Sequence, residues 1–338
     1  MPKPPEVSVL LPVRDGAATL AAALESLASQ SHREHEVIVV DDGSQDESID
    51  IVKGFAQRDP RVRLVEPGAV GLVAALNIAA QEARAPILAR MDADDICMPY
   101  RLRRQLSWLR RRPELTVVGS LVETFGSAAD NAGWQRYIKW LNSCRDEERI
   151  ARELLVESPL AHPSVMMRRG PFESVGGYRD FDGPEDYDLW LRLARAGARF
   201  AKVPVVLLRW RDHAQRLTRM DSRYRPEAFL ALKIEHLLAG PLKERARPLL
   251  LWGAGRDGGR FGRALLARGV AIEAFIDIDP RRIGNTRHGR PVVAPNDITD
   301  FEHPMVLVVV PVAGARKLIR GRLTLRGLRE GRDYWVCA

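Results

Sequence analysis

The sequence predicts an α/β protein in which a large N-terminal α/β domain is followed by a small Rossmann-like α/β domain. Short apolar runs alternate with helical patterns through the first part of the chain. Two of these runs end in clusters of acidic residues, and a second pattern of strand, glycine turn and helix begins near Arg247. Alternation of this kind is typical of doubly wound parallel sheets covered by helices.

Four strands and three helices are expected in the N-terminal part. The run Val-Ile-Val-Val at 37–40 is the clearest strand, because β-branched residues in succession are typical of a strand buried on both faces. Apolar residues at helical spacing follow the first three strands. The other strands are expected at 7–11, 62–65 and 87–89, and the helices begin near 19, 49 and 72.

The middle of the chain gives isolated elements rather than a regular alternation. We expect helices over 146–156, 186–196 and 227–238, and strands over 164–167 and 203–208. These elements extend the first domain to residue 240, and the second domain is predicted over 247–338.

The second domain opens on a strand followed by glycines at 253, 255 and 258, so that the pattern Gly-x-Gly-x-x-Gly lies between a strand and a helix. Asp277 or Asp279, at the end of the next strand, stands where a ribose-binding acid belongs. A dinucleotide site is one interpretation. We favour the other, in which the glycines serve close packing in a module that helps assembly or acceptor recruitment, because about 90 residues are few for a complete dinucleotide-binding domain.

The chain has 338 residues, a formal net charge of +8 and a pI of about 9.7. Arginines cluster between 101 and 112. This basic excess suits nucleotide phosphates, nucleic acid or an acidic membrane surface, and a solvated basic face explains it equally well. No helix-turn-helix, zinc-finger or RNA-binding signature is present, so we expect no nucleic-acid partner.

The cysteines and the apolar segments indicate in which cellular compartment the protein is expected. Cys97, Cys144 and Cys337 form no Cys-x-x-Cys pair, so neither a disulfide framework nor a thiolate zinc site is expected. No signal peptide and no run of about 20 apolar residues is visible. We expect a cytoplasmic protein, and its basic surface is compatible with contact to the inner face of the membrane.

The acidic cluster Asp92-Ala93-Asp94-Asp95 follows a predicted strand. Carboxylates spaced by one residue can converge on a hard cation, and Mg²⁺ or Mn²⁺ commonly bridges such oxygens to substrate phosphates. Asp-x-Asp also occurs in ordinary turns. The position directly after a buried strand favours the metal-binding interpretation, because ligands bind at the carboxyl ends of parallel strands.

Two further acidic motifs carry candidate chemistry. Asp41-Asp42-Gly43-Ser44 follows the second strand, where a carboxylate can accept hydrogen bonds from a base or a ribose, or can cap the next helix. Glu185-Asp186 opens a predicted helix. Acids there are favoured by the helix dipole, and a carboxylate in reach of an acceptor hydroxyl can also act as general base.

In order and spacing these motifs resemble glycosyltransferase family 2. The resemblance covers residues 5–240 and includes the segments 11–15, 39–44, 71–77, 91–95 and 185–186. It implies a GT-A fold, a nucleotide-sugar donor (most often a UDP-sugar), a carbohydrate or glycolipid acceptor, a Mn²⁺ or Mg²⁺ cofactor and inversion at the anomeric carbon. A role in bacterial surface polysaccharide or glycolipid assembly is a further implication.

The resemblance also implies residue roles. Pro12 and Asp15 line the nucleotide pocket, although asparagine is common at the position of Asp15. Asp41 binds the base, with Asp42 beside it, and Asp92 lies near the ribose.

Asp94 binds the metal, with Asp95 a weaker candidate. Asp186 is the catalytic base, and Glu185 either supports it or contacts the acceptor. His213 is the late histidine near the metal or diphosphate, or a surface histidine; His162 lies in a segment near the acceptor. Arg209 and Arg211 could bind the diphosphate or be exposed strand residues.

Two other functions stay open on the sequence alone. A NAD-dependent oxidoreductase acting on a sugar nucleotide would use the C-terminal glycines, but no convincing Tyr-x-x-x-Lys pair accompanies them. A transferase without activity that senses a sugar nucleotide is the second alternative, and the complete acidic set argues against it.

Overall fold

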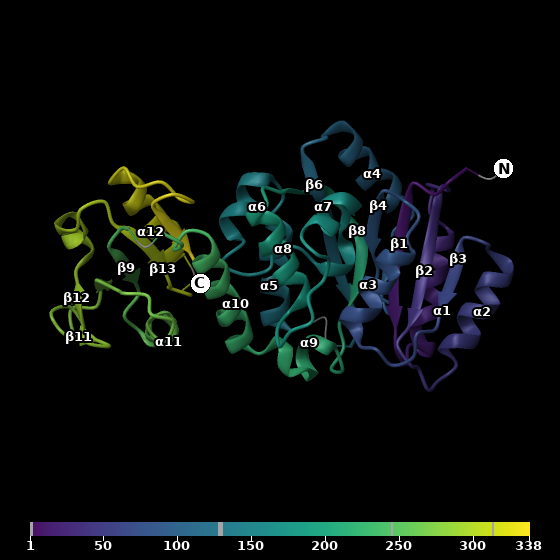
Figure 1. The fold of residues 1–338 in the computed structure, drawn as a ribbon, viewed down its shortest axis with the longest axis horizontal. Coiled ribbons are helices and arrows are strands. Elements are labelled where there is room, and N and C mark those ends of the chain that lie inside the picture. Colours follow the sequence, from purple (N-terminus) through teal and green to yellow (C-terminus); the bar gives the residue numbers. More distant parts are fainter. Residues whose placement is uncertain (1–2, 128–130, 245, 313) are drawn as a thin grey trace. The chain divides into compact units, whose positions relative to one another are not determined.

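The computed structural model describes residues 3–127, 131–244, 246–312 and 314–338 (Figure 1). It contains two compact α/β units, which confirms the predicted fold class. The first unit comprises Met1–Ala151 and Pro159–Tyr224, and the second comprises Arg152–Ser158 and Arg225–Ala338. The second unit therefore takes a short segment from the middle of the chain and includes the helix predicted to end the first domain.

The described part of the first unit contains an eight-stranded sheet in the order β3-β2-β1-β4-β7-β6-β8-β5. Its strands are β1 (Val7–Val13), β2 (His35–Asp41), β3 (Val62–Val65), β4 (Ile87–Arg90), β5 (Ile96–Cys97), β6 (Leu115–Phe125), β7 (Met166–Arg168) and β8 (Arg199–Arg211). The helices are α1 (Ala17–Ala28), α2 (Ser48–Arg58), α3 (Leu72–Glu82), α4 (Arg101–Arg111), α5 (Ala132–Ser143), α6 (Glu147–Glu153), α7 (Arg169–Ser174), α8 (Glu185–Arg195) and α9 (Leu217–Met220), with 3-10 turns η1 (His162–Ser164) and η2 (Ser222–Tyr224).

Strands β1 to β4 are parallel neighbours, as the alternating pattern predicted. Every residue of β1 and β2 is buried, because helices cover the sheet and leave no polar face. The parallel order stops at β4, since β7 runs antiparallel to both β4 and β6. The first unit is therefore a parallel sheet that is extended by strands of mixed direction.

Three of the expected elements in the middle of the chain are wrong at their ends. The strand expected over 203–208 is longer and runs over Arg199–Arg211, because it pairs with β6 along this length. The helix expected over 146–156 ends at Glu153, because the following residues turn and place Val156 in the core of the second unit. The strand expected over 164–167 begins at Met166, because Ser164 closes a 3-10 turn by donating its hydroxyl to Ala161 O at 2.7 Å.

The described residues of the second unit form a six-stranded sheet in the order β11-β12-β10-β9-β13-β14, parallel except for the hairpin strand β11. Its strands are β9 (Leu249–Trp252), β10 (Ala274–Ile276), β11 (Thr286–Arg287), β12 (Arg290–Val293), β13 (Met305–Val308) and β14 (Tyr334–Val336). Its helices are α10 (Pro226–Ala239), α11 (Arg256–Leu266) and α12 (Ala315–Leu325), with the 3-10 turn η3 (Pro295–Asp300). A glycine turn joins β9 to α11, as in Rossmann-like folds.

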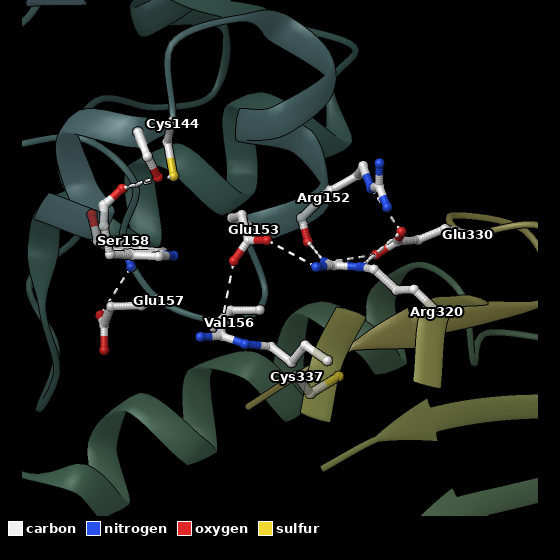
Figure 2. Close-up of polar contacts among 12 residues, drawn as sticks. Cys144, Arg152, Glu153, Val156, Glu157, Ser158, Arg320, Glu330 and Cys337 are labelled. Carbon is white, nitrogen blue, oxygen red and sulfur yellow. Dashed lines mark hydrogen bonds and ion pairs between the residues drawn. The ribbon is translucent and has the colours of Figure 1, made fainter. Parts of the chain in front are cut away.

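Ion pairs hold the segment Arg152–Ser158 in the second unit (Figure 2). The carboxylate of Glu153 is buried and accepts from Arg320 of α12 at 3.0 Å. Arg320 also pairs with Glu330 at 2.9 Å, and Glu330 accepts from Arg152 at 2.8 Å. Lys233 of α10 donates to Val156 O at 2.7 Å. These bonds make the segment part of the second unit's interior.

Among the described residues, no helix combines the length and the apolar character that crossing a membrane requires.

Candidate active site

Three loops at one edge of the first sheet gather the acidic residues that the sequence singled out. They follow β1, β2 and β4, which are neighbours in the sheet and run in the same direction. The carboxyl ends of parallel strands meet at one edge, where ligands bind in sheets of this kind. The end of β8 and the start of α8 supply further polar groups.

The loop after β4 brings three carboxylates together. One ligand atom each from Asp92, Asp94 and Asp95 lies within 4.8 Å of the others. Burial, together with the neighbouring carboxylate of Asp92, raises the pKa of Asp94 and raises that of Asp95 well above its ordinary range. Packing of like charges away from water is unfavourable unless a cation joins them.

These carboxylates fit a hard divalent cation. The Oδ2 atom of Asp95 is buried and finds no hydrogen-bond partner in the described part of the chain. His213 Nε2 lies 3.1 Å from Asp94 Oδ2, so an imidazole nitrogen faces the same carboxylate. Oxygen ligands with one added nitrogen suit Mn²⁺, and oxygen ligands alone suit Mg²⁺.

The end of β8 fixes the geometry of this loop. Arg211 N donates to Asp95 Oδ1 at 2.8 Å, and its guanidinium donates to Asp94 O at 2.7 Å. Arg211, expected to reach a diphosphate or solvent, thus holds the loop's backbone. Arg209 pairs with Glu123 at 2.9 Å and stacks on Phe125.

The loop after β2 presents one carboxylate oxygen toward the same edge. Asp41 Oδ2 accepts from Gly43 N and Ser44 N at 3.1 and 3.0 Å, which leaves buried Oδ1 without a partner among the described residues. A side chain at Gly43 would meet Ala69 at 2.8 Å, and its φ of +75° also requires glycine. Asp41 is therefore held rigidly with one acceptor atom available.

Asp42 and Asp15 have backbone partners instead. Asp42 Oδ1 accepts from Val70 N and Gly71 N at 2.7 and 2.6 Å, and so fixes the loop before α3. Asp15 Oδ1 accepts from Gln45 N at 2.7 Å, which ties the loop after β1 to the loop after β2. Pro12 is buried within β1 itself.

The start of α8 places Glu185 and Asp186 in different environments. Glu185 is buried, and burial raises its pKa although the Tyr224 hydroxyl donates to its Oε2 at 2.7 Å. His162 Nδ1 lies 3.6 Å from Glu185 Oε1, and its Nε2 lies 2.8 Å from the Tyr178 hydroxyl. Asp186 is partly exposed and accepts from Tyr187 N at 2.6 Å.

Sequence reasoning missed Arg90, the last residue of β4. Its side chain is buried beneath the acidic loop and pairs with Asp92 at 2.5 Å. Burial alone would lower the pKa of Arg90, but Asp92 outweighs it and raises that pKa. Arginine within an apolar strand was the available signal, since a buried cation needs a paired anion. Tyr224 was also missed, and its sequence context gave no signal.

The acidic edge matches proteins of known type. A model of "Glycosyl transferase family 2" matches residues 8–176 of the chain. The chain belongs to this family. The amylovoran biosynthesis glycosyltransferase AmsE of Erwinia amylovora is 34% identical over 57% of the chain and 70% of its own length. EpsE of Bacillus subtilis, named a putative glycosyltransferase, is 30% identical over 73% of the chain and 88% of its own length.

A third relative has a defined reaction in its name, and solved structures share the fold. The UDP-Gal:alpha-D-GlcNAc-diphosphoundecaprenol beta-1,3-galactosyltransferase of Escherichia coli is 27% identical over 60% of the chain and 73% of its own length. TarS residues 1–349 of S. aureus with UDP-GlcNAc gives a TM-score of 0.56 at 18% identity, over 69% of this chain and 66% of that one. The mannosyltransferase PcManGT of Pyrobaculum calidifontis, with GDP-Man and Mn²⁺, gives 0.50 at 20%, over 80% and 76%.

The chain is thus a family 2 glycosyltransferase whose first unit has the GT-A fold and is followed by a second α/β unit. Two relatives carry a biosynthetic role in their names, amylovoran biosynthesis for AmsE and O-antigen biosynthesis for WbnJ of Escherichia coli.

Proposed function

We propose that the protein is an inverting, metal-dependent glycosyltransferase that moves a sugar from a nucleotide-sugar donor, a UDP-sugar by preference, to an acceptor hydroxyl. The observation that carries this proposal is the convergence of Asp92, Asp94 and Asp95 beside His213 at the sheet edge. Asp95 Oδ2 is buried and has no hydrogen-bond partner among the described residues, which is expected of a carboxylate oxygen that serves as a ligand to a cation.

Asp41 and Asp92 are the donor-side residues of the proposal. The available Oδ1 of Asp41 accepts a hydrogen bond from a base N–H. Asp92, held by Arg90, accepts from a ribose hydroxyl. Pro12 shapes the floor of the pocket, while Asp15 and Asp42 keep its loops in place. UDP in preference to other nucleotides follows the names of the galactosyltransferase relative and of the TarS complex.

Asp94 and His213 would hold Mn²⁺ or Mg²⁺, with Asp95 behind them. A bound divalent cation supplies Lewis-acid stabilisation of the departing nucleoside diphosphate. Arg211 contributes by fixing the loop through Asp94 O and Asp95 Oδ1, so that the carboxylates do not have to reorganise during the reaction.

Asp186 is the catalytic base of the proposal. It is the more exposed acid of the pair at the start of α8, whereas Glu185 is buried against Tyr224 and His162. Asp186 takes the proton from the acceptor hydroxyl as the oxygen attacks the anomeric carbon from the face opposite the diphosphate. The bond to the diphosphate breaks in the same displacement, so the configuration inverts. Glu185 positions the helix start.

The acceptor class comes from the galactosyltransferase relative, whose name states a sugar linked through a diphosphate to undecaprenol. We propose a carbohydrate acceptor of this lipid-linked kind, used in surface polysaccharide assembly. A NAD-dependent function of the second unit is less well supported, because both carboxylate oxygens of Asp277 are already engaged within the protein.

A donor-hydrolysis screen tests the proposal without knowledge of the acceptor. The protein is incubated with UDP-, GDP- and dTDP-sugars, with and without Mn²⁺, and nucleotide release is measured. Metal-dependent release from one nucleotide class, lost in Asp94→Ala, is the expected result. No release and no metal-dependent nucleotide binding by calorimetry would contradict the proposal and favour a function centred on the second unit.

A further inference from the structure

Helix α4 has a basic face that the transfer reaction does not use. The buried side of the helix consists of Arg101, Leu102, Gln105, Leu106 and Leu109. The opposite side carries four exposed arginines, here called the basic face: Arg103, Arg104, Arg110 and Arg111. Arg104, Arg110 and Arg111 follow Arg103 by one, seven and eight residues, which places all four on one side of the helix. The pair 103 and 104 lies about 10 Å along the helix from the pair 110 and 111.

No acidic residue interrupts this part of the chain between Pro99 and Pro113. Arg110 pairs with Glu6, whereas the described residues offer no carboxylate within salt-bridge distance of Arg103, Arg104 or Arg111. Surfaces that serve only solubility usually intersperse both signs of charge. A face of one sign made of arginine favours an anionic partner, and guanidinium groups suit phosphate oxygens in particular.

Aromatic rings accompany the arginines. Tyr100, directly before the helix, is 50% exposed, and the guanidinium of Arg103 lies 5.0 Å from its ring centroid. Arg112 lies 4.1 Å from the ring centroid of Trp108. Aromatic rings beside basic groups are typical of helices that rest in the headgroup region of a bilayer. An acidic protein surface would not require the exposed ring.

We propose that the basic face of α4, together with Tyr100, docks the protein onto an anionic phospholipid surface. We choose this partner because its charge is complementary to the basic face and because the exposed ring suits a headgroup layer. The lipid-linked acceptor, which rests on the proposed function, agrees with this choice. Lipid phosphates bind Arg103, Arg104 and Arg111, and the ring of Tyr100 enters the headgroup layer.

The helix is attached rigidly to the candidate active site. Arg101, on the buried side of α4, donates to Arg90 O at 2.7 Å and to Val165 O at 3.2 Å. Arg90 is the end of β4 and pairs with Asp92 of the acidic loop. Docking through α4 therefore holds the donor site at a fixed height above the lipid surface, where a lipid-linked acceptor meets it.

Vesicle sedimentation tests this inference on the full chain. The probes are vesicles of phosphatidylcholine alone and of phosphatidylcholine with phosphatidylglycerol in equal parts. We expect binding to the mixed vesicles only, weakened by salt. The triple variant Arg103→Gln, Arg104→Gln, Arg111→Gln should bind about a hundredfold more weakly, because each basic residue near an anionic surface contributes to binding.

A matched control removes three exposed arginines of the second unit: Arg268→Gln, Arg290→Gln and Arg322→Gln. It has the same net charge as the α4 variant and should keep vesicle binding. Equal loss in both variants, absence of binding to mixed vesicles, or tighter binding to a duplex oligonucleotide than to mixed vesicles would overturn the inference.

The α4 variant should hydrolyse donor in solution at the rate of the unaltered protein. This readout separates the two proposals. Vesicle binding without donor hydrolysis in any variant would contradict the proposed function alone, and hydrolysis without vesicle binding would contradict the docking surface alone.

Discussion

The two units carry similar glycine-and-acid turns at the ends of parallel strands, but their acids are satisfied differently. In the first unit, Asp41 Oδ1 and Asp95 Oδ2 are buried without hydrogen-bond partners among the described residues. In the second unit, Asp277 Oδ1 accepts from Ile278 N and Asp279 N, and its Oδ2 accepts from Ala254 N and Arg282. The acids of the first unit thus retain acceptor oxygens without partners among the described residues, whereas both carboxylate oxygens of Asp277 in the second unit accept hydrogen bonds within the protein.

The glycine turn of the second unit likewise has an explanation within the protein. A Cβ at Gly258 would lie 1.7 Å from Gly253 O, so glycine is required there for the helix to approach its own turn. That requirement supports the packing interpretation of Gly-x-Gly-x-x-Gly without any ligand. A sequence motif for binding therefore has to be judged by the hydrogen-bond capacity that its residues retain in the fold.

The largest expected effect is at the metal cluster. Asp94→Ala should lower donor hydrolysis about a thousandfold, because the leaving diphosphate loses its electrostatic stabilisation. Asp300→Ala, at an exposed acid of the second unit, is the control and should keep full activity. Rates are measured by nucleotide release at saturating Mn²⁺, and an unchanged rate in Asp94→Ala would remove the first unit's edge from the mechanism.

Asp186→Asn should lower transfer to an acceptor by at least about a hundredfold, since the hydroxyl loses its general base. Nucleotide and Mn²⁺ binding, followed by calorimetry, should remain. Glu185→Gln is the comparison variant, because the amide oxygen of glutamine can still accept the hydrogen bond that the Tyr224 hydroxyl donates to Glu185. Full transfer by Asp186→Asn would show that the base is another group.

A third prediction concerns the segment that completes the second unit. Arg320→Met removes the ion-pair partner that lies 3.0 Å from the buried carboxylate of Glu153, while the pair with Arg316 at 3.4 Å remains, and should destabilise this unit by about 2 kcal/mol. Arg322→Met on the exposed side of the same helix is the control. Hydrogen exchange of the α12 and β14 amides is the measurement, and equal exchange in both variants would mean that the ion pairs of Figure 2 contribute nothing.

The smallest effect is expected at the acid that is already satisfied. Burial raises the pKa of Asp277, but hydrogen bonds from the backbone of Asp279 and Ala254 and from Arg282 outweigh burial and lower it below its ordinary 3.8. This stabilisation is present above that value and is lost as pH falls through the lower folded-state pKa.

Asp277→Asn should therefore destabilise the second unit by about 1 kcal/mol at neutral pH and by less in acid. Hydrogen exchange of β9 and β10 at both pH values checks this, with Asp300→Asn as control. Donor hydrolysis should be unaffected, and its loss would break the contrast between the units.

The sequence predicted the parts of the fold that depend on local pattern. β3 (Val62–Val65) has its predicted bounds, because a short apolar run between turn signals is typical of a strand. β6 and α5 were missed, since strand β6 depends on pairing with β8, 84 residues away at Leu115 and Arg199. The turn at Glu153 could not be predicted either, because it is dictated by contacts in the second unit.

The candidate site divides in the same way. The acidic residues of the three loops were predictable from their place after buried strands. The buried partners were not, because the contact of Tyr224 with Glu185 spans 39 residues and that of Arg211 with Asp95 spans 116.

Calorimetric titration of UDP with and without Mn²⁺ tests the central claim most directly, which is that the acidic edge of the first unit holds a metal-bound nucleotide. The unaltered protein, Asp94→Ala and Asp277→Asn are compared. One metal-dependent site that disappears in Asp94→Ala and persists in Asp277→Asn is the predicted result. Nucleotide binding that persists in Asp94→Ala and disappears in Asp277→Asn would contradict the account and place the ligand on the second unit.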